Sequence, residues 1–293
     1  MKSGIAMGAL LALAGLVGCG DGGASGTLRL TLNGEEASRE GFPVGEGEDR
    51  IAFADGWSVE FEKVLVSIVD VRLAASDGDE AGVAVDPIVA DLHLGTPEGW
   101  RLEGVPARRW DRFSYRFGAP TMDARRVNAV EDADLEAMVM GGHAFWIEGV
   151  ARRDGQEVPF RWGLPVAVDN VRCVNGVDET DGLVIGEGGL SEAELTVHLD
   201  HLFFDSLASE EPGMRFEAMA AVAGEGPLTL EDLAAQSITD VRDAEGEPIE
   251  VEGAPLIYDP GDTPLEARDL RGFVLAAART MGHFQGEGHC DYE

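Results

Sequence analysis

Hydrophobic and polar residues alternate over much of the first two thirds of the chain. The alternation is clearest over 27–32 and 57–61, and the second run continues into a more apolar segment over 64–73. A period of two places successive side chains on opposite faces of a strand, so these segments predict strands. The region 57–73 predicts either two strands or one long bent strand. Further strands are predicted over 88–94, 110–117, 144–152, 158–163, 183–185 and 194–199.

Helical patterns are largely confined to the last third of the chain. One short helix is predicted earlier, over 132–140, because acids begin it and Gly141-Gly142 end it. Later helices are predicted over 215–222, 230–235 and 265–281, with a loop over 240–264. Glycine and proline separate the strands at short intervals, as is typical of an antiparallel sandwich or barrel. We therefore predict a mainly β fold, α+β overall: an antiparallel β-sandwich over 27–202, with a helical C-terminal segment over 203–293 packed on it.

Composition narrows the classes of function. Of 293 residues, 44% are hydrophobic, which is enough for a substantial core. The 55 acidic residues outnumber the 22 lysines and arginines, for a formal net charge of −33. Binding to a nucleic-acid backbone normally requires a basic face, so we expect no nucleic-acid partner.

The N-terminal segment has the pattern of a signal peptide. Lys2 supplies positive charge, and an uncharged apolar run follows over 5–17. Thirteen helical residues rise only ~20 Å, too little to cross a hydrocarbon core of ~30 Å. The run ends in Leu16-Val17-Gly18-Cys19, which resembles the lipobox of bacterial lipoproteins.

This resemblance implies removal of residues 1–18 and lipidation of Cys19. Several acyl chains on one residue give durable membrane anchoring. The small polar residues over 19–26 then form a flexible tether. Gly20 follows Cys19 where some bacteria use Asp to retain lipoproteins in the inner membrane, which favours the outer membrane of the cell envelope. An ordinary secreted protein, in which Cys19 is incidental, is the alternative.

The two remaining cysteines, Cys173 and Cys290, are 117 residues apart in the sequence. In an oxidising compartment a disulfide between them is the most economical interpretation. Two free thiols or two metal-ligating thiolates are the alternatives.

Four of the six histidines fall in two short segments. The first segment contains His198, Asp200 and His201, and the second, which is rich in glycine, contains His283, Glu287 and His289. Imidazole and carboxylate groups are the usual ligands of zinc and copper(II). We predict a shared transition-metal site, copper or zinc, with candidate ligands His198, His201, His283, His289 and Asp200. Structural histidines in the first segment and a loose tail in the second are the alternative interpretation.

A calcium site is less favoured. The segment 224–233 resembles the second half of an EF-hand loop, but Ala221 and Ala223 occupy the first two ligand positions and cannot bind calcium. Helix capping by Thr229 with Asp232 explains the same pattern.

No catalytic motif stands out in the chain. It lacks the Gly-x-Ser-x-Gly, phosphate-loop, Gly-x-Gly-x-x-Gly and His-Glu-x-x-His patterns. Its strands, tryptophans and late histidines are similar in overall layout to the periplasmic copper-binding proteins associated with methanobactin uptake. That resemblance implies a secreted β-rich copper protein and assigns no individual residue.

Three hypotheses follow. The favoured one is a non-catalytic, metal-binding envelope lipoprotein. The second is a lipoprotein that displays a sandwich at the membrane surface for an envelope protein or a glycan. A hydrolase is the least favoured.

Overall fold

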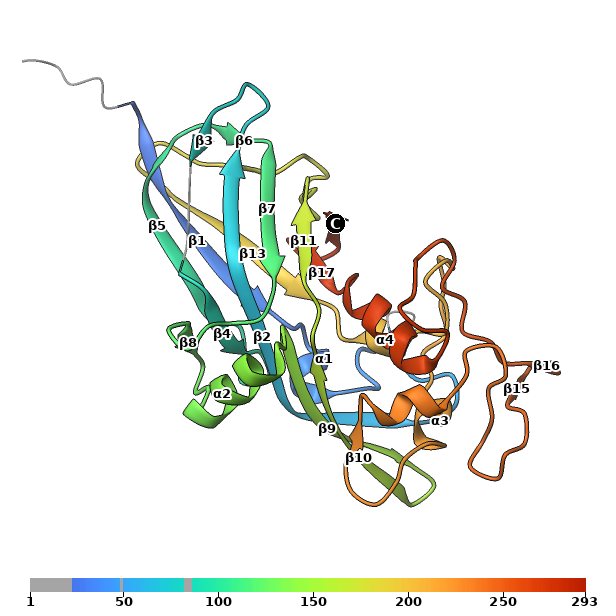
Figure 1. Ribbon diagram of the computed structural model, residues 1–293. Coiled ribbons are helices and arrows are strands. Elements are labelled where there is room, and N and C mark those ends of the chain that lie inside the picture. Colours follow the sequence, from blue (N-terminus) through green and yellow to red (C-terminus); the bar gives the residue numbers. More distant parts are fainter. Residues whose placement is uncertain (1–22, 48–49, 82–85) are drawn as a thin grey trace, which may run out of the picture.

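The computed structural model describes residues 23–47, 50–81 and 86–293. The predicted signal peptide, Cys19 and the beginning of the tether lie outside the described residues. Strand β1 begins at Ser25, so the last two residues of the predicted tether belong to a strand. The chain is mainly β, as predicted, and Figure 1 shows its strands in extended layers with the helices at their margins. No helix in the described ranges is long and apolar enough to cross a membrane.

The smaller of the two main sheets has five strands in the order β18-β17-β13-β1-β5. Strand β1 pairs in parallel with β13 and antiparallel with β5, so this sheet is mixed rather than purely antiparallel. The leucines of β1 at 28, 30 and 32 are fully buried while the residues between them are partly exposed. Its strands are β1 (Ser25–Asn33), β5 (Glu98–Pro106), β13 (Leu190–Val197), β17 (Gly282–Phe284) and β18 (Gly288–His289).

The larger sheet has ten strands and is centred on the 17-residue strand β2. Of the two alternatives predicted for this region, two strands or one long bent strand, the structure has the single strand, and its pairing with β9 shifts register between Phe61 and Lys63. The strands are β2 (Ser58–Ala74), β3 (Glu80–Ala81), β4 (Ile88–Asp91), β7 (Arg112–Phe117), β8 (Arg125–Val127), β9 (Phe145–Arg153), β10 (Gln156–Leu164), β11 (Val168–Val171), β14 (Leu228–Thr229) and β19 (Asp291–Tyr292). Two minor pairs complete the described strands: β6 (Arg109–Trp110) with β12 (Leu183–Val184), and β15 (Glu250–Val251) with β16 (Ala254–Pro255).

The two main sheets share one hydrophobic core. Phe113 of β7 stacks on Phe284 of β17 with ring centroids 4.4 Å apart, and the Tyr115 hydroxyl donates a hydrogen bond to the His283 carbonyl. A second aromatic group, which includes Phe53, Phe203 and Phe216, extends the core under the C-terminal half of the chain. Burial of these side chains is the main stabilising contribution to the fold.

The helices are short and lie mostly at the margins of the sheets (Figure 1). Helix α2 packs Leu135 and Met138 against Leu65 and Val89, which forms a satellite core on the outer side of the larger sheet. The described helices are α1 (Ala37–Glu40), α2 (Asp132–Gly141), α3 (Glu217–Ala220) and α4 (Leu270–Ala278), with 3-10 turns η2 (Asp200–Phe203) and η3 (Asp232–Ala235).

The C-terminal segment is less helical than predicted and does more than pack on the sheets. The helix predicted over 265–281 spans only Leu270–Ala278, and the residues after it form β17, β18 and β19, which extend both main sheets. Glycine permits this turn back. A Cβ on Gly288 would come within 2.2 Å of the Phe284 and Val174 carbonyl oxygens. The backbone therefore approaches other strands too closely for any larger residue.

The expected disulfide between Cys173 and Cys290 is present. Cys173 is fully buried, and Cys290 lies between β18 and β19. The bridge ties the end of the chain to the segment that follows β11.

Candidate metal centre

Three histidines from two distant parts of the sequence meet at one end of the smaller sheet. His198 follows β13, His201 lies in η2 and His283 lies in β17. Each offers one ring nitrogen, and these three nitrogens all lie within 4.8 Å of one another. The rings of His198 and His283 stack with centroids 4.0 Å apart, and the His201 ring centroid is 5.3 Å from that of His283.

Strand pairing explains why His198 and His283 are neighbours. Strands β13 and β17 are antiparallel, with Thr196 opposite His283, and the His198 N–H donates to the Met281 carbonyl at 3.0 Å. Side chains alternate along extended backbone, so His198, one residue beyond the end of β13, lies on the same face as Thr196. His283 therefore lies diagonally across from His198 on that face. Leu195 and Phe284 point to the opposite face, into the core.

His201 is positioned by the turn η2 and by the end of helix α4. Leu202 and Phe203, which follow it, are buried, and the Phe203 ring packs 5.0 Å from Phe53. The His201 Nδ1 lies 2.8 Å from the Thr280 hydroxyl oxygen, and that hydroxyl donates to the Ala277 carbonyl at 2.9 Å. Since the single hydroxyl proton is already used, Nδ1 must be the donor to Thr280. The lone pair of His201 is therefore on Nε2.

Two carboxylates adjoin the histidines. Glu35, His198 and Glu287 form a second group whose ligand atoms lie within 4.8 Å of one another. The Glu35 Oε1 is 3.8 Å from the His198 Nε2. Glu35 follows β1, and Glu287 lies in the turn between β17 and β18. The parallel pairing of β1 with β13 brings Glu35 beside residues more than 160 positions later in the sequence.

Burial shapes the electrostatics of the site. Desolvation, with a further contribution from the neighbouring imidazoles, lowers the pKa of His201 to about 3 and that of His283 to about 4. Desolvation raises the pKa of Glu35 and of Asp200, and the nearby His198 opposes both shifts. At neutral pH, His201 and His283 are therefore uncharged, the form in which an imidazole binds a metal.

Two ring nitrogens of this site have no hydrogen-bond partner among the described residues. The Nε2 of His198 and the Nδ1 of His283 are both buried and unpaired within the described residues. A buried polar atom with no partner costs free energy, so such atoms are rare unless a water or an ion completes them. His283 belongs to the three-histidine group, and the His198 Nε2 lies 3.8 Å from the Glu35 Oε1.

The structure unites only part of the predicted ligand set. His198, His201 and His283 come together, whereas His289 and Asp200 belong to neither ligand group. His289 pairs with His283 across the β17–β18 hairpin but is exposed, and Asp200 is close enough to His198 for their charges to interact. Glu35 is not among the predicted ligands, because only the long-range pairing of β1 with β13 brings it to the site.

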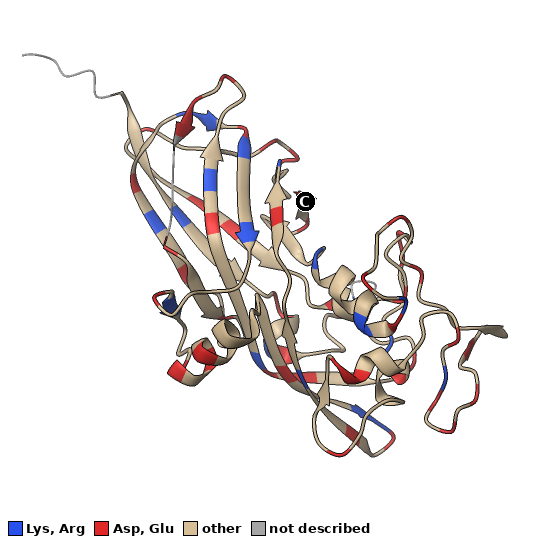
Figure 2. Cartoon of the chain, viewed as in Figure 1, with Lys and Arg blue, Asp and Glu red and all other residues tan. Residues whose placement is uncertain are grey.

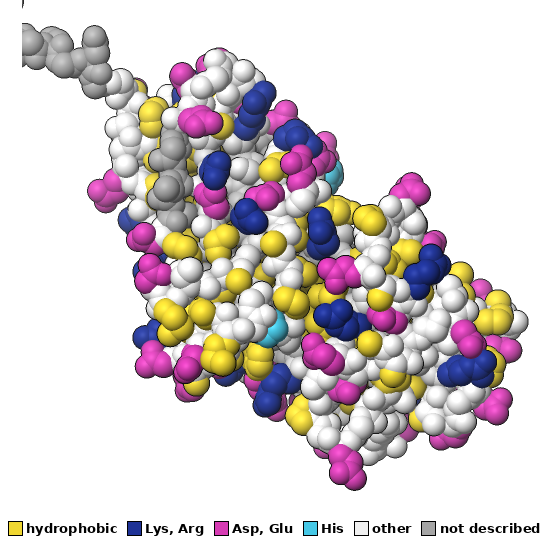
Figure 3. Space-filling view, viewed as in Figure 1, with side chains coloured by type: hydrophobic (Ala, Val, Ile, Leu, Met, Phe, Trp, Pro, Cys, Tyr) yellow, Lys and Arg dark blue, Asp and Glu magenta, His cyan; other side chains and the backbone are white. Residues whose placement is uncertain are grey.

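The EF-hand-like segment over 224–233 contains a hydrogen-bonded turn between Thr229 and Asp232. The Thr229 N–H donates to the Asp232 carboxylate at 2.8 Å and the Asp232 N–H donates to the Thr229 hydroxyl at 3.3 Å, so the predicted reciprocal bonds form. The helical turn η3 nevertheless begins only at Asp232, and its N-cap, Glu231, makes no capping bond through its side chain. Figure 2 shows acidic residues along many of the loops, and on the face shown in Figure 3 acidic and basic side chains are interspersed.

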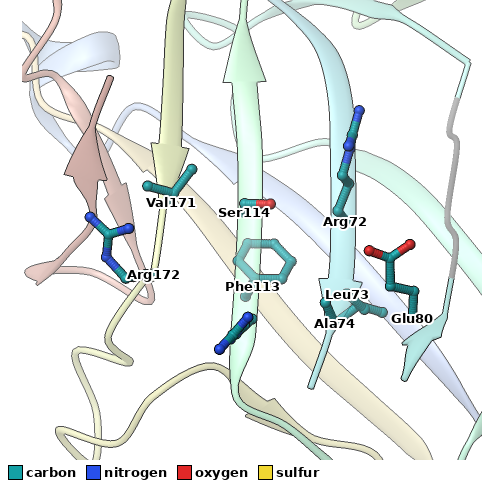
Figure 4. Close-up of a pocket in the computed structure, with 9 residues that line it drawn as sticks. Arg72, Leu73, Ala74, Glu80, Phe113, Ser114, Val171 and Arg172 are labelled. Atoms are coloured by element: carbon teal, nitrogen blue, oxygen red, sulfur yellow. The ribbon is translucent and has the colours of Figure 1, made fainter. Parts of the chain in front are cut away.

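A cavity of about 440 Å³ opens on the outer face of the larger sheet. Its lining includes three arginines, and Figure 4 shows Arg72 and Arg172 on either side of Ser114. Arg72 pairs with Asp70 at 2.5 Å, and Arg172 pairs with Asp291 at 2.6 Å. With two of its three guanidinium groups already paired, this cavity is a salt-bridged surface groove rather than a concentrated anion site.

No family model, curated protein or solved structure matches this chain. The interpretation of the histidine site therefore depends on its own geometry.

Proposed function

We propose that this chain is a non-catalytic bacterial envelope lipoprotein that binds one or more transition-metal ions, zinc or copper, through His198, His201 and His283. The observation that carries the proposal is the convergence of three imidazole nitrogens to within 4.8 Å of one another. The ligands of one zinc ion, each ~2.1 Å from the metal, lie roughly 3–4 Å apart. Small side-chain movements would therefore close the group on an ion.

The ligand types support zinc or copper(II) over other metals. Imidazole suits both, whereas calcium and magnesium prefer sites made entirely of oxygen ligands. All three ligands of the group are imidazoles, and none is a thiolate, a ligand that favours copper(I). Glu35 and Glu287, beside His198, add carboxylates that either zinc or copper(II) accepts.

The anchor is proposed from the sequence alone. The lipobox-like Leu16-Val17-Gly18-Cys19 supports lipidation at Cys19, and Gly20 supports placement in the outer membrane. We expect Cys19→Ser to shift the protein from the membrane fraction to the soluble fraction, with Ser3→Ala as a control that stays with membranes. Retention of Cys19→Ser in membranes would contradict the anchor.

Metal analysis tests the site. The full chain, purified in detergent without a histidine tag, is stripped of metal and loaded with zinc or copper(II), and bound metal is measured by mass spectrometry. When the free ion concentration is one hundred times the Kd, binding stabilises the folded state by about 2.7 kcal/mol. That gain raises the melting temperature by roughly 5–10 °C.

Variants connect the binding to the histidines. We expect His201→Gln and His283→Gln each to lose ion binding at the three-histidine site and most of the melting shift, while His143→Gln, a histidine outside both groups, retains them. Absence of bound metal and of a melting shift in the wild-type chain would overturn the metal-binding function. The display of a sandwich to an envelope protein or a glycan would then be the better hypothesis.

A further inference from the structure

We propose that Glu35, His198 and Glu287 form a second position for a divalent transition-metal ion, which shares His198 with the three-histidine position. This inference rests on the proposed function and adds a two-ion stoichiometry to it. The two ligand groups have only His198 in common. The ligand atoms of each group lie within 4.8 Å of one another. One ion holds its ligands within about 4.2 Å, so small side-chain movements would close each group on an ion of its own.

The His198 nitrogen that faces the carboxylates needs a partner. The His198 side chain is only 7% exposed, and its Nε2 makes no hydrogen bond within the described residues. The nearest carboxylate oxygen, Oε1 of Glu35, is 3.8 Å away, which is too far for a hydrogen bond. An ion about 2.1 Å from each atom fits that separation. The unpaired nitrogen and the adjacent carboxylates therefore indicate the same ligand.

The negative charge of the carboxylates around this position also favours binding of a cation. Asp200 and Glu287 are close enough to Glu35 for their carboxylates to repel it. Among the described residues, none of these three acids forms an ion pair with lysine or arginine, although such pairs are common elsewhere on the chain. One divalent ion at the histidines leaves the three carboxylates with an excess negative charge, and a second divalent ion removes it.

The second position takes the Nε2 of His198, which faces Glu35, and the three-histidine position then takes its Nδ1, on another edge of the imidazole. A neutral imidazole keeps one N–H, so ligation at both nitrogens releases that proton to the solvent. The Glu287 side chain is exposed and the Glu35 side chain is 35% exposed, so the second position is open to ions from solution.

Zinc stoichiometry tests the second position. The metal-free full chain in detergent is saturated with zinc, freed of excess zinc by gel filtration, and measured by mass spectrometry. We expect two ions per wild-type chain and one ion in the Glu35→Gln/Glu287→Gln double variant. A Glu36→Gln/Glu187→Gln double variant removes two exposed acids outside the groups and should retain two ions. Circular dichroism confirms that each variant is folded, and Gln keeps the size of Glu.

Each outcome separates the two proposals. One ion in the wild-type chain, lost in His201→Gln, would overturn the second position and leave the proposed function intact. No ion in the wild-type chain would overturn both. Two ions in the Glu35→Gln/Glu287→Gln variant would place the second ion elsewhere and also overturn the inference.

Discussion

At the scale of single residues, Thr280 controls which nitrogen of His201 is available. Its hydroxyl donates to Ala277 and accepts from the His201 Nδ1, which leaves the lone pair on Nε2. We expect Thr280→Val to lower zinc affinity by roughly 10–100-fold, the usual effect of losing such a partner. Thr280→Ser, which keeps the hydroxyl, should bind nearly as the wild type does.

Nitrogen NMR of the metal-free protein separates this role from a general loss of stability. The wild type and Thr280→Ser should show His201 with its proton on Nδ1, and Thr280→Val should show a mixture of tautomers. Unchanged zinc affinity in Thr280→Val would contradict the positioning role.

His143 provides a pH dependence away from the metal centre. Burial lowers its pKa below the usual 6.5, and its Nδ1 is buried without a partner among the described residues. A histidine whose folded pKa is depressed favours folding fully above its unfolded pKa, and this contribution is lost as the pH falls towards the folded pKa. We expect the free energy of unfolding to decrease less between pH 7.5 and 5.5 in His143→Gln than in the wild type, as measured by urea titration. Parallel pH profiles of the two proteins would contradict this.

At the scale of elements, the disulfide holds the hairpin that carries two proposed ligands. Strands β17 and β18 bring His283 and Glu287 to the site, and Cys290 directly follows β18. Cross-linking two positions 117 residues apart contributes roughly 4–5 kcal/mol in the chain-entropy model. We expect Cys173→Ser/Cys290→Ser to lower the free energy of unfolding by several kcal/mol and to weaken zinc binding. Hydrogen exchange should accelerate most over 282–292. The Cys19→Ser variant, which keeps the bridge, is the control, and equal exchange in both variants would show that the hairpin is held without it.

Some strands and helices could be predicted from local sequence patterns, and others could not. Clean alternation predicted β1, and acids at the start with Gly141-Gly142 at the end predicted α2, because each signal is local. Strand β5 was not predicted, since its burial does not alternate cleanly and its pairing with β1 shifts register twice. The two-residue strand β18 has no local pattern of its own and exists only through its pairing with β17.

Part of the candidate site was likewise predictable from local sequence patterns, and part was not. Concentration of histidines in two segments was enough to predict that His198, His201 and His283 would meet. The exclusion of His289 depends on a hairpin that leaves its side chain exposed, and the inclusion of Glu35 depends on the pairing of β1 with β13. Long-range pairings of this kind are decided by packing of the whole chain, so a single sequence contains no local signal for them.

At the scale of the whole molecule, the formal charge of −33 sets the response to salt. Self-repulsion among excess negative charges destabilises a compact state, and salt weakens that repulsion. Salt also weakens surface ion pairs, but exposed pairs contribute only ~0–1 kcal/mol each. In several pairs of this chain, at least one of the two side chains is more than half exposed. The screening length falls from ~10 Å at 0.1 M towards ~3 Å at 1 M, so the long-range repulsion is reduced first. We expect the metal-free protein to melt at a higher temperature in 0.5 M than in 0.05 M sodium chloride. Choline chloride should raise the melting temperature by the same amount if screening, rather than sodium binding, is the cause. A melting temperature that falls with both salts would show that the ion pairs outweigh the net charge.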